Sequence, residues 1–212
     1  MVSRVLYRPF EESDFDAVAT ILQRDWHTDS ENDVYNYLEA CADLCYCLSE
    51  STFSQIALID DDVRGIVLAR AGAPDTCWAD RWKGAERDIL AQMSAIEPDQ
   101  TEAYLACTRT QATTNHHLLE QSGISRDDEI CLLAVSSAAQ GLGIGTILLD
   151  AATSYVSAQG ATATYLYTDT DCTYTFYEHH NFKRMAQHRA NREELRAGLP
   201  VRSFLYSLDL SA

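Results

Sequence analysis

The chain has 212 residues with 16 basic and 32 acidic side chains, so its formal charge at pH 7 is −16. Apolar residues make up 46% and charged residues 23%, which is typical of a globular protein and excludes a disordered one. A nucleic-acid-binding protein needs a basic surface to displace counterions from phosphates, so the acidity argues against that class.

The hydrophobic runs and the cysteines also limit the class of protein and its compartment. No apolar run approaches the roughly 18 residues that a membrane span needs, and Met1–Val5 lacks the apolar stretch of a secretion signal. Seven cysteines in a chain large enough to fold without disulfides indicate reduced thiols. Cys41, Cys45 and Cys47 match no zinc spacing, so we expect core positions. We expect a cytoplasmic protein without a metal and without a membrane partner.

The first predicted elements are a strand and two helices. Residues 5–7 form a short apolar strand before Pro9, and Ser13 with Asp16 has the spacing of a capping box. The buried stripe of the first helix is predicted to contain Phe15, Val18, Leu22 and Trp26. The pair Ser30 and Asp33 predicts the start of the second helix. Its buried face is predicted to contain Val34, Leu38, Cys41 and Cys45.

A hairpin and a helical segment follow. Residues 55–59 and 63–70 are strand-like, and the three aspartates Asp60–Asp62 between them favour a turn over a cation site. Residues 71–128 differ in character: an apolar helical pattern stops at Pro98, and a second one ends near Gly123. At about 150 residues per domain, we expect one domain, 1–212, with a helical insertion at about 71–128.

The most informative stretch is 129–159. Residues 129–135 are almost all apolar, which predicts a strand buried on both faces. Gly141, Gly143 and Gly145 then lead into a helix that ends by Gly160. Further on we expect a strand at 163–168, a short aromatic helix at 172–180, and closing strands at 182–188 and 202–208.

Glycines before a helix make a phosphate cradle, because the backbone can approach a ligand and about four amides at the helix start lack partners. A Walker A loop needs lysine, which is missing here, and a dinucleotide fingerprint needs glycine where Thr146 stands. The sequence of this loop instead fits the pattern Gln140-x-x-Gly143-x-Gly145.

This motif between a strand and a helix resembles the acetyl-CoA signature of the GNAT N-acetyltransferase superfamily. Leu6–Asp14 is similar to the family's opening strand and capped helix, and the Asp60–Asp62 hairpin is similar to its second and third strands. Phe176–Phe182 resembles its Phe-Tyr-Glu-x-x-Gly-Phe segment, with Asn181 in place of glycine. The resemblance covers roughly 1–70 and 129–210.

The resemblance implies a mixed α/β (α+β) fold: a curved mixed sheet with splayed central strands, helices on both faces, and here a helical insertion between the third and fourth strands. It implies acetyl-CoA as co-substrate. Backbone groups of Leu133, Ala134 and Val135 would bind the pantetheine arm. The pyrophosphate would be held by the amides of Gln140, Gly141, Leu142, Gly143, Ile144, Gly145 and Thr146. Thr170, which replaces a family asparagine, and Thr173 complete the predicted cofactor site.

Two residues are candidates for proton transfer. Tyr177 matches the family's general acid toward the CoA thiolate, although it could also be a packed aromatic residue. Glu129 begins the strand before the loop and resembles the glutamate that deprotonates the amine through water in the histone-acetyltransferase branch. The alternative for Glu129 is a solvated carboxylate at a strand edge. Residues 132–182 contain no Lys or Arg, so phosphate binding would depend on amides and the helix dipole, with Lys183 or Arg184 as the nearest basic residues.

The sequence therefore predicts an acyl-CoA-dependent N-acetyltransferase that acts on a primary amine by direct attack in a ternary complex. The alternative is a non-catalytic CoA-binding or regulatory module of the same fold. The expected partner is a small-molecule or peptide amine, cationic in view of the acidic chain. A homodimer is compatible with the sequence, and nucleic acid is not an expected partner.

Overall fold

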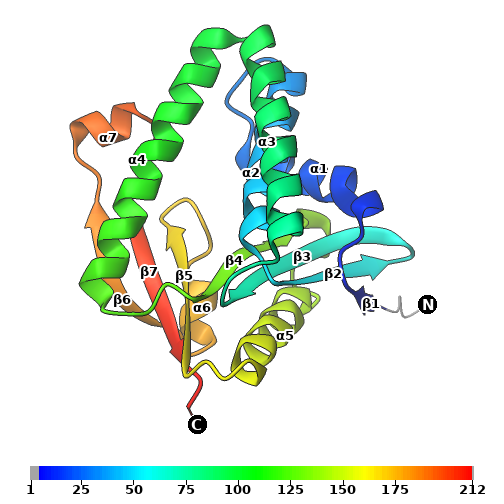
Figure 1. Ribbon diagram of the computed structural model, residues 1–212, viewed down its shortest axis with the longest axis vertical. Helices are drawn as coiled ribbons and strands as arrows, with labels where there is room; N and C mark the ends of the chain where they lie inside the picture. The colour runs from blue at the N-terminus through cyan, green and yellow to red at the C-terminus, as the bar shows by residue number, and fades with distance from the viewer. Residues whose placement is uncertain (1–4, 212) are drawn as a thin grey trace.

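The computed structural model describes residues 5–211, which form one mixed sheet flanked by helices (Figure 1). The seven strands are β1 (Val5–Arg8), β2 (Phe53–Ile59), β3 (Asp62–Ala71), β4 (Asp128–Val135), β5 (Ala163–Asp169), β6 (Lys183–Arg189) and β7 (Arg202–Asp209). Their order in the sheet is β1-β2-β3-β4-β5-β7-β6. All neighbouring pairs are antiparallel except β4 and β5, which are parallel.

Helices cover both faces of this sheet. They are α1 (Phe15–Trp26), α2 (Asp33–Glu50), α3 (Thr76–Ile96), α4 (Pro98–Ser122), α5 (Ile144–Ala158), α6 (Thr175–His179) and α7 (Arg192–Arg196). On one face, α1 and α2 pack on β2–β4 through a core that includes Leu22, Leu44 and Ile66. On the other face, α5 packs through Leu148 and Ala152. The predicted mixed sheet with helices on both faces is confirmed.

The start of α1 differs from the prediction. The capping box is formed by Glu11 and Asp14 rather than by Ser13 and Asp16. Asp14 accepts from the Glu11 amide at 2.7 Å, and Arg8 holds the same carboxylate with two bonds of 2.7 and 2.8 Å. Because Arg8 fixes Asp14, the chain already turns at residues 12–14, before α1 begins.

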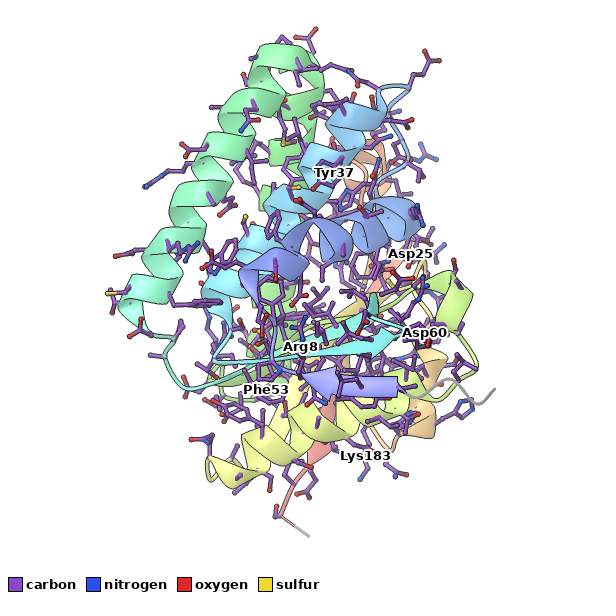
Figure 2. The ribbon with its side chains drawn as sticks, turned by 90° about the vertical axis from the view of Figure 1, so that its right-hand side faces the viewer. Arg8, Asp25, Tyr37, Phe53, Asp60 and Lys183 are labelled. Atoms are coloured by element: carbon purple, nitrogen blue, oxygen red, sulfur yellow. The ribbon has the colours of Figure 1, made fainter. Side chains whose placement is uncertain are left out.

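Helix α2 lies against α1, and Figure 2 shows Tyr37 of α2 beside α1. The Tyr37 hydroxyl donates to Asp16 Oδ1 at 2.8 Å and so joins the two helices. Asn32 caps α2, and its side chain accepts from the amides of Val34 and Tyr35. Val34 itself is 59% exposed, so its predicted burial is wrong: it lies in the first turn, before the helix passes over the core.

The β2–β3 hairpin turns at Asp60 and Asp61, whose φ angles are 53° and 68° (Figure 2). Aspartate tolerates this left-handed conformation better than most residues, and two such residues in sequence fit a tight hairpin turn. The turn predicted from the three aspartates is confirmed.

Helices α3 and α4 form the hairpin between β3 and β4. Pro98 is the first residue of α4, and Gly123, with φ 69°, ends it in the left-handed conformation. Helix α3 packs along α2, where Met93 joins Tyr35 in a small core, while α4 passes to the other side and packs on β6 and β7 (Figure 1). The hairpin therefore packs on α2 on one side and on β6 and β7 on the other.

Between residues 5 and 211, no helix has the length and apolar character of a membrane span, and no group of three or more His, Cys, Asp or Glu side chains is arranged to hold a metal ion. Cys41 and Cys45 lie in the core as expected. Burial raises the pKa of Cys41 to about 11 and that of Cys45 to about 12. Both thiols are therefore protonated and unreactive at neutral pH.

Candidate active site

The centre of the site is the place where β4 and β5 separate. The two strands pair at Glu129 and Tyr165, and no further pair joins them within the described residues. On its other edge β4 stays paired with β3 through Val135. Among the described residues, the backbone of Leu133–Val135 therefore has no strand partner on the side of β5. This is the separation of the central strands that the family resemblance implied.

A β-bulge in β4 sets which side chains face each layer. Leu68 and Ala69 of β3 pair with Leu132 and Ile130, so Cys131 is an extra residue in the ladder. As a result, Ile130 packs with α5 while Leu132 packs with α1 and α2. Glu129 and Cys131 thereby face α2. Bulges of this kind are frequent beside active sites, where they redirect side chains.

The predicted burial of β4 on both faces holds only in part. Ile130, Leu132 and Ala134 are buried, whereas Leu133 and Val135 are half-buried. The physical reason is the separation of β4 from β5, which removes one neighbour from the second half of the strand.

The glycine loop ends in a set of open amides. Gly141 and Gly143 have φ angles of 77° and 76°, and a Cβ atom on either would meet nothing within 4 Å. Helix α5 begins at Ile144 without a side-chain cap. Within the described residues, the amides of 141–146 have no hydrogen-bond acceptor. Such a helix start carries partial positive charge and suits an anion.

The residues of this loop divide into accessible and anchoring ones. Gln140 and Leu142 are exposed, the latter at 60%, while Ile144 is buried and fixes the helix on the sheet. Gly145 lies against Phe176, since a Cβ atom there would be 3.5 Å from the ring. The side chain of Thr146 is held by His180, with 3.0 Å between Oγ1 and Nε2.

Tyr177 lies on α6, which follows β5. Its ring packs against Phe176 and Phe182, at centroid distances of 5.3 and 5.9 Å. Burial raises the pKa of its hydroxyl above the ordinary value of 10, and nearby Cys172 adds to the effect. Among the described residues the hydroxyl has no hydrogen-bond partner. The group is therefore a protonated donor at neutral pH with a free O–H.

The two predicted threonines occupy different places. Thr170 is tied to β7: its amide donates to the Arg202 carbonyl at 3.0 Å, and its Oγ1 accepts from the Arg202 amide at 3.3 Å. Thr173 is exposed at the turn before α6, and its carbonyl accepts from the Phe176 amide at 3.0 Å. Within the described part of the chain, no hydrogen bond joins either one to the glycine loop.

Glu129 sits in a buried ion pair rather than in solvent. Its Oε2 accepts from Arg70 Nη2 at 2.5 Å and from the Tyr165 hydroxyl at 3.0 Å, and its side chain is 17% exposed. Burial raises the pKa of Glu129, while Arg70 and Tyr165 act against this. Oε1 makes no hydrogen bond to another described residue. The alternative of a solvated carboxylate does not hold.

Arg70 is the central cation of this network. Its side chain is 7% exposed, and it also contacts Glu50 at 2.8 Å and the Arg126 carbonyl at 3.0 Å. Sequence reasoning did not identify Arg70 or Tyr165 as site residues. A signal was present for Arg70, because a charged residue that ends an apolar inner strand needs a buried partner.

The side of Glu129 that faces α2 is acidic. Burial of the Tyr46 hydroxyl raises its pKa there, and the charges of Glu129 and Glu50 raise it further. Burial raises the pKa of the Cys47 thiol nearby. Four carboxylates raise it further, those of Asp43, Glu129, Glu86 and Glu50. This part of the site therefore favours a positive charge.

Part of the chain matches a known family. Residues 95–184 match the family model described as an acetyltransferase (GNAT) domain. Comparison with curated protein sequences gives no match.

Solved structures share the fold at low sequence identity. Ard1 from Thermoplasma volcanium is 16% identical, with 97% of each chain covered and a TM-score of 0.54. The ribosomal-protein-S18-alanine N-acetyltransferase from Escherichia coli is 10% identical, with 99% of this chain and 96% of that chain covered and a TM-score of 0.55. Aminoglycoside 6'-acetyltransferase type Ii is 14% identical, with 97% of each chain covered and a TM-score of 0.56. The resemblance predicted from the motifs is confirmed.

Proposed function

We propose that this chain, which has the GNAT acetyltransferase fold and matches the GNAT family model over residues 95–184, is an N-acetyltransferase that uses acetyl-CoA and a primary amine in a ternary complex. The observation that carries the proposal is a path along the chain with unpaired backbone groups at both of its ends. It leads from the free edge of Leu133–Val135 to the open amides of 141–146.

This path fits the shape and charge of acetyl-CoA. The β4 edge offers strand-like hydrogen bonds to the pantetheine arm, and the amides of 141–146 suit the pyrophosphate. When bound, acetyl-CoA supplies an activated acetyl thioester. A backbone N–H of Leu133–Val135 would polarise the acetyl carbonyl, and removing one such donor in other enzymes costs about 10²–10³ in rate.

Tyr177 would act as the general acid. Its hydroxyl stays protonated at neutral pH because burial raises its pKa, and it lacks a competing acceptor among the described residues. It would donate this proton to the sulfur that leaves the acetyl group. General acids of this kind contribute about 10²–10⁴ in rate.

Glu129 would act as the general base through a water molecule. Arg70 and Tyr165 both bind Oε2, so Oε1 is the atom left to take a proton. An alkyl ammonium near pKa 10 must lose a proton before it can attack. Arg70 would orient the carboxylate for this transfer.

The acceptor would be a cationic amine. Asp43, Glu50 and Glu86 lie with Glu129 around Cys47, where a positive charge is favoured. The relatives named above act on different amines according to their names, so the fold alone does not select one. The substrate class proposed here depends on the carboxylates of this chain.

The α3–α4 insertion would form part of the acceptor side and shape substrate choice. Tyr104 of α4 donates to Asp43 Oδ1 at 2.5 Å, and Leu118 packs with Tyr165, the pairing partner of Glu129. We expect Tyr104→Phe to change the KM of the amine while the KM of acetyl-CoA stays the same. Thr108→Val on the exposed side of α4 is the control, and equal effects from the two substitutions would contradict this role.

The decisive experiment measures thiol release from acetyl-CoA across a panel of polyamines, aminoglycosides and lysine peptides. We expect turnover in the wild type, and losses of about 10²–10⁴ in kcat for Tyr177→Phe and Glu129→Gln. Tyr174→Phe and Glu120→Gln are matched controls that lie outside the proposed chemistry. Unchanged rates in both site variants would show that the residue roles are wrong, although the enzyme class could stand.

A non-catalytic CoA-binding module is the second candidate. It is favoured by the involvement of Glu129 in an ion pair and by the absence of Lys and Arg from residues 132–182. Tight CoA binding without turnover on the whole amine panel would support it over the enzyme.

A further inference from the structure

The ring of His180 joins the helix of Tyr177 to the glycine loop. His180 follows α6, and its Nδ1 lies 2.8 Å from the Phe176 carbonyl oxygen. A carbonyl oxygen only accepts, so Nδ1 carries the proton in this contact. Nε2 of the neutral ring is then an acceptor. The Thr146 hydroxyl, 3.0 Å away, therefore donates to it.

Thr146 places this ring beside the open amides. It is the third residue of α5, and its own amide belongs to the set without an acceptor. The Phe176 ring packs against His180, with 4.3 Å between centroids, and also lies against Gly145. His180 is thus one side chain away from the proposed pyrophosphate position, and packing holds it there.

We propose that His180 is the cation of this phosphate cradle and takes up a proton from solvent when the CoA pyrophosphate binds. The inference rests on the proposed function, since it needs CoA at the glycine loop. One N–H bond forms at Nε2, and no covalent bond breaks in the protein. Nε2–H then donates to Thr146 Oγ1. The Thr146 hydroxyl can therefore donate its own hydrogen bond to a phosphate oxygen.

The charges around His180 support this role. Residues 132–182 contain no Lys or Arg, so imidazole is the basic side chain nearest the cradle in that segment. On α6, Glu178 is paired with Arg184 of β6, and His179 is exposed. Asp150 is one turn beyond Thr146 on α5. None of the described carboxylates forms an ion pair with His180.

The local charge at the start of α5 changes when the CoA pyrophosphate binds. Without a ligand, the open amides at the start of α5 carry partial positive charge. A bound pyrophosphate reverses the local charge and stabilises the imidazolium, in the same way that a nearby anion favours the charged form of any base. Imidazole is the side chain that can gain a proton in this way near neutral pH.

Calorimetry of CoA binding at pH 7 in HEPES, ACES and imidazole buffers tests the inference. The buffers differ in ionisation enthalpy, so the dependence of the observed heat on buffer gives the number of protons taken up. We expect a fraction of one proton for the wild type and a lower value for His180→Gln. Protons exchanged by the CoA phosphates are common to both proteins, so the difference isolates the histidine.

His179→Gln is the matched control and should behave like the wild type. At pH 6.5 we expect His180→Gln to bind CoA about 10-fold more weakly, which is the usual scale for one hydrogen bond to a charged group. The NMR signal of the His180 ring in the wild type should shift toward the protonated form on adding CoA, a readout that needs no variant.

Two results would overturn the proposal in different ways. CoA binding with equal proton uptake in the wild type and His180→Gln, or with an unshifted ring signal, would contradict the role of His180 alone. No CoA binding to the wild type would contradict the proposed function as well.

Discussion

Arg70 and Glu129 form an ion pair across β3 and β4, with Nη2 and Oε2 2.5 Å apart and side chains 7% and 17% exposed. The pair connects the end of one strand to the start of the next, where β4 and β5 are still joined. Arg70 and Tyr165 therefore hold Oε2 of this carboxylate, and Oε1 makes no hydrogen bond to another described residue.

Removing Arg70 should destabilise the protein strongly. Arg70→Met would leave the Glu129 carboxylate buried without its cation, which costs about 3–5 kcal/mol. Urea unfolding measures this loss. In the double variant Arg70→Met with Glu129→Gln, the cost should be less than the sum of the single losses, because no uncompensated charge remains. Additive losses would contradict the coupling.

The surroundings of His27 predict how the free energy of unfolding depends on pH. Its side chain is 10% exposed and lies 3.5 Å from Glu39 and 3.2 Å from Asp43. Burial opposes its charge, but the two carboxylates outweigh this and raise its pKa from 6.5 to about 9. A raised pKa stabilises the fold fully below pH 6.5, and this stabilisation is lost as pH rises through 9.

His27→Gln should therefore remove a decline in stability between pH 6.5 and 9. The decline in the wild type attributable to His27 is on the order of 3 kcal/mol. Unfolding free energies at four pH values across this window would show it. The exposed His117 on α4 provides the control substitution to glutamine. A parallel decline in wild type and His27→Gln would contradict the prediction.

Gly143 should tolerate a side chain less well than Gly145, although both lie at the start of α5. Gly143 has a φ of 76°, so Gly143→Ala costs about 1–2 kcal/mol in backbone strain even though its surroundings are open. At Gly145 an added Cβ would make only ordinary contacts, the nearest 3.5 Å from Phe176. Thermal unfolding of the two variants compares them, and equal losses would count against backbone strain as the cause.

Asn181 is held at a φ of 65°, where glycine is less strained. We expect Asn181→Gly to leave stability unchanged or to raise it by up to about 1 kcal/mol, and Asn181→Ala to lower it by about 1 kcal/mol. The same order should appear in the melting temperatures. Greater stability of the alanine variant would show that this turn is not kept in the left-handed conformation.

The alkaline limit of catalysis should lie above the ordinary range of tyrosine. Burial raises the pKa of Tyr177, so its hydroxyl remains protonated above pH 10. A general acid acts in its protonated form, and kcat should therefore not fall between pH 8 and 10 through this group. A kcat profile with a basic limb near pH 9 that disappears in Tyr177→Phe would contradict this expectation.

Local signals explain what the sequence could predict. Asp60–Asp62, Pro98 and Gly123 each act through their own backbone conformation, so the β2–β3 hairpin, the start of α4 and its end could be located without the fold. The glycine loop was predictable for the same reason, and its open amides follow from the start of α5.

The missed features depend on residues that are distant in sequence. Arg70 and Glu129 are 59 positions apart, and Thr146 and His180 are 34 apart. The bulge at Cys131 depends on how β3 aligns with β4, which periodicity within one strand does not contain. Trp26 was placed in the buried stripe of α1 but is 43% exposed, because a helical period predicts the face and not where the covering layer stops.

The α3–α4 hairpin has a mechanical consequence for the divided sheet. Among residues 5–211, β4 and β5 pair at Glu129 and Tyr165 alone, so this single pair would by itself allow the two halves of the sheet to rotate relative to each other. The α3–α4 hairpin packs on α2 on one side and on β6 and β7 on the other (Figure 1), and Leu118 of α4 packs with Tyr165 at the joining point itself. Because the hairpin packs on elements of both halves, it restricts this rotation. It therefore fixes the distance between β4 and β5.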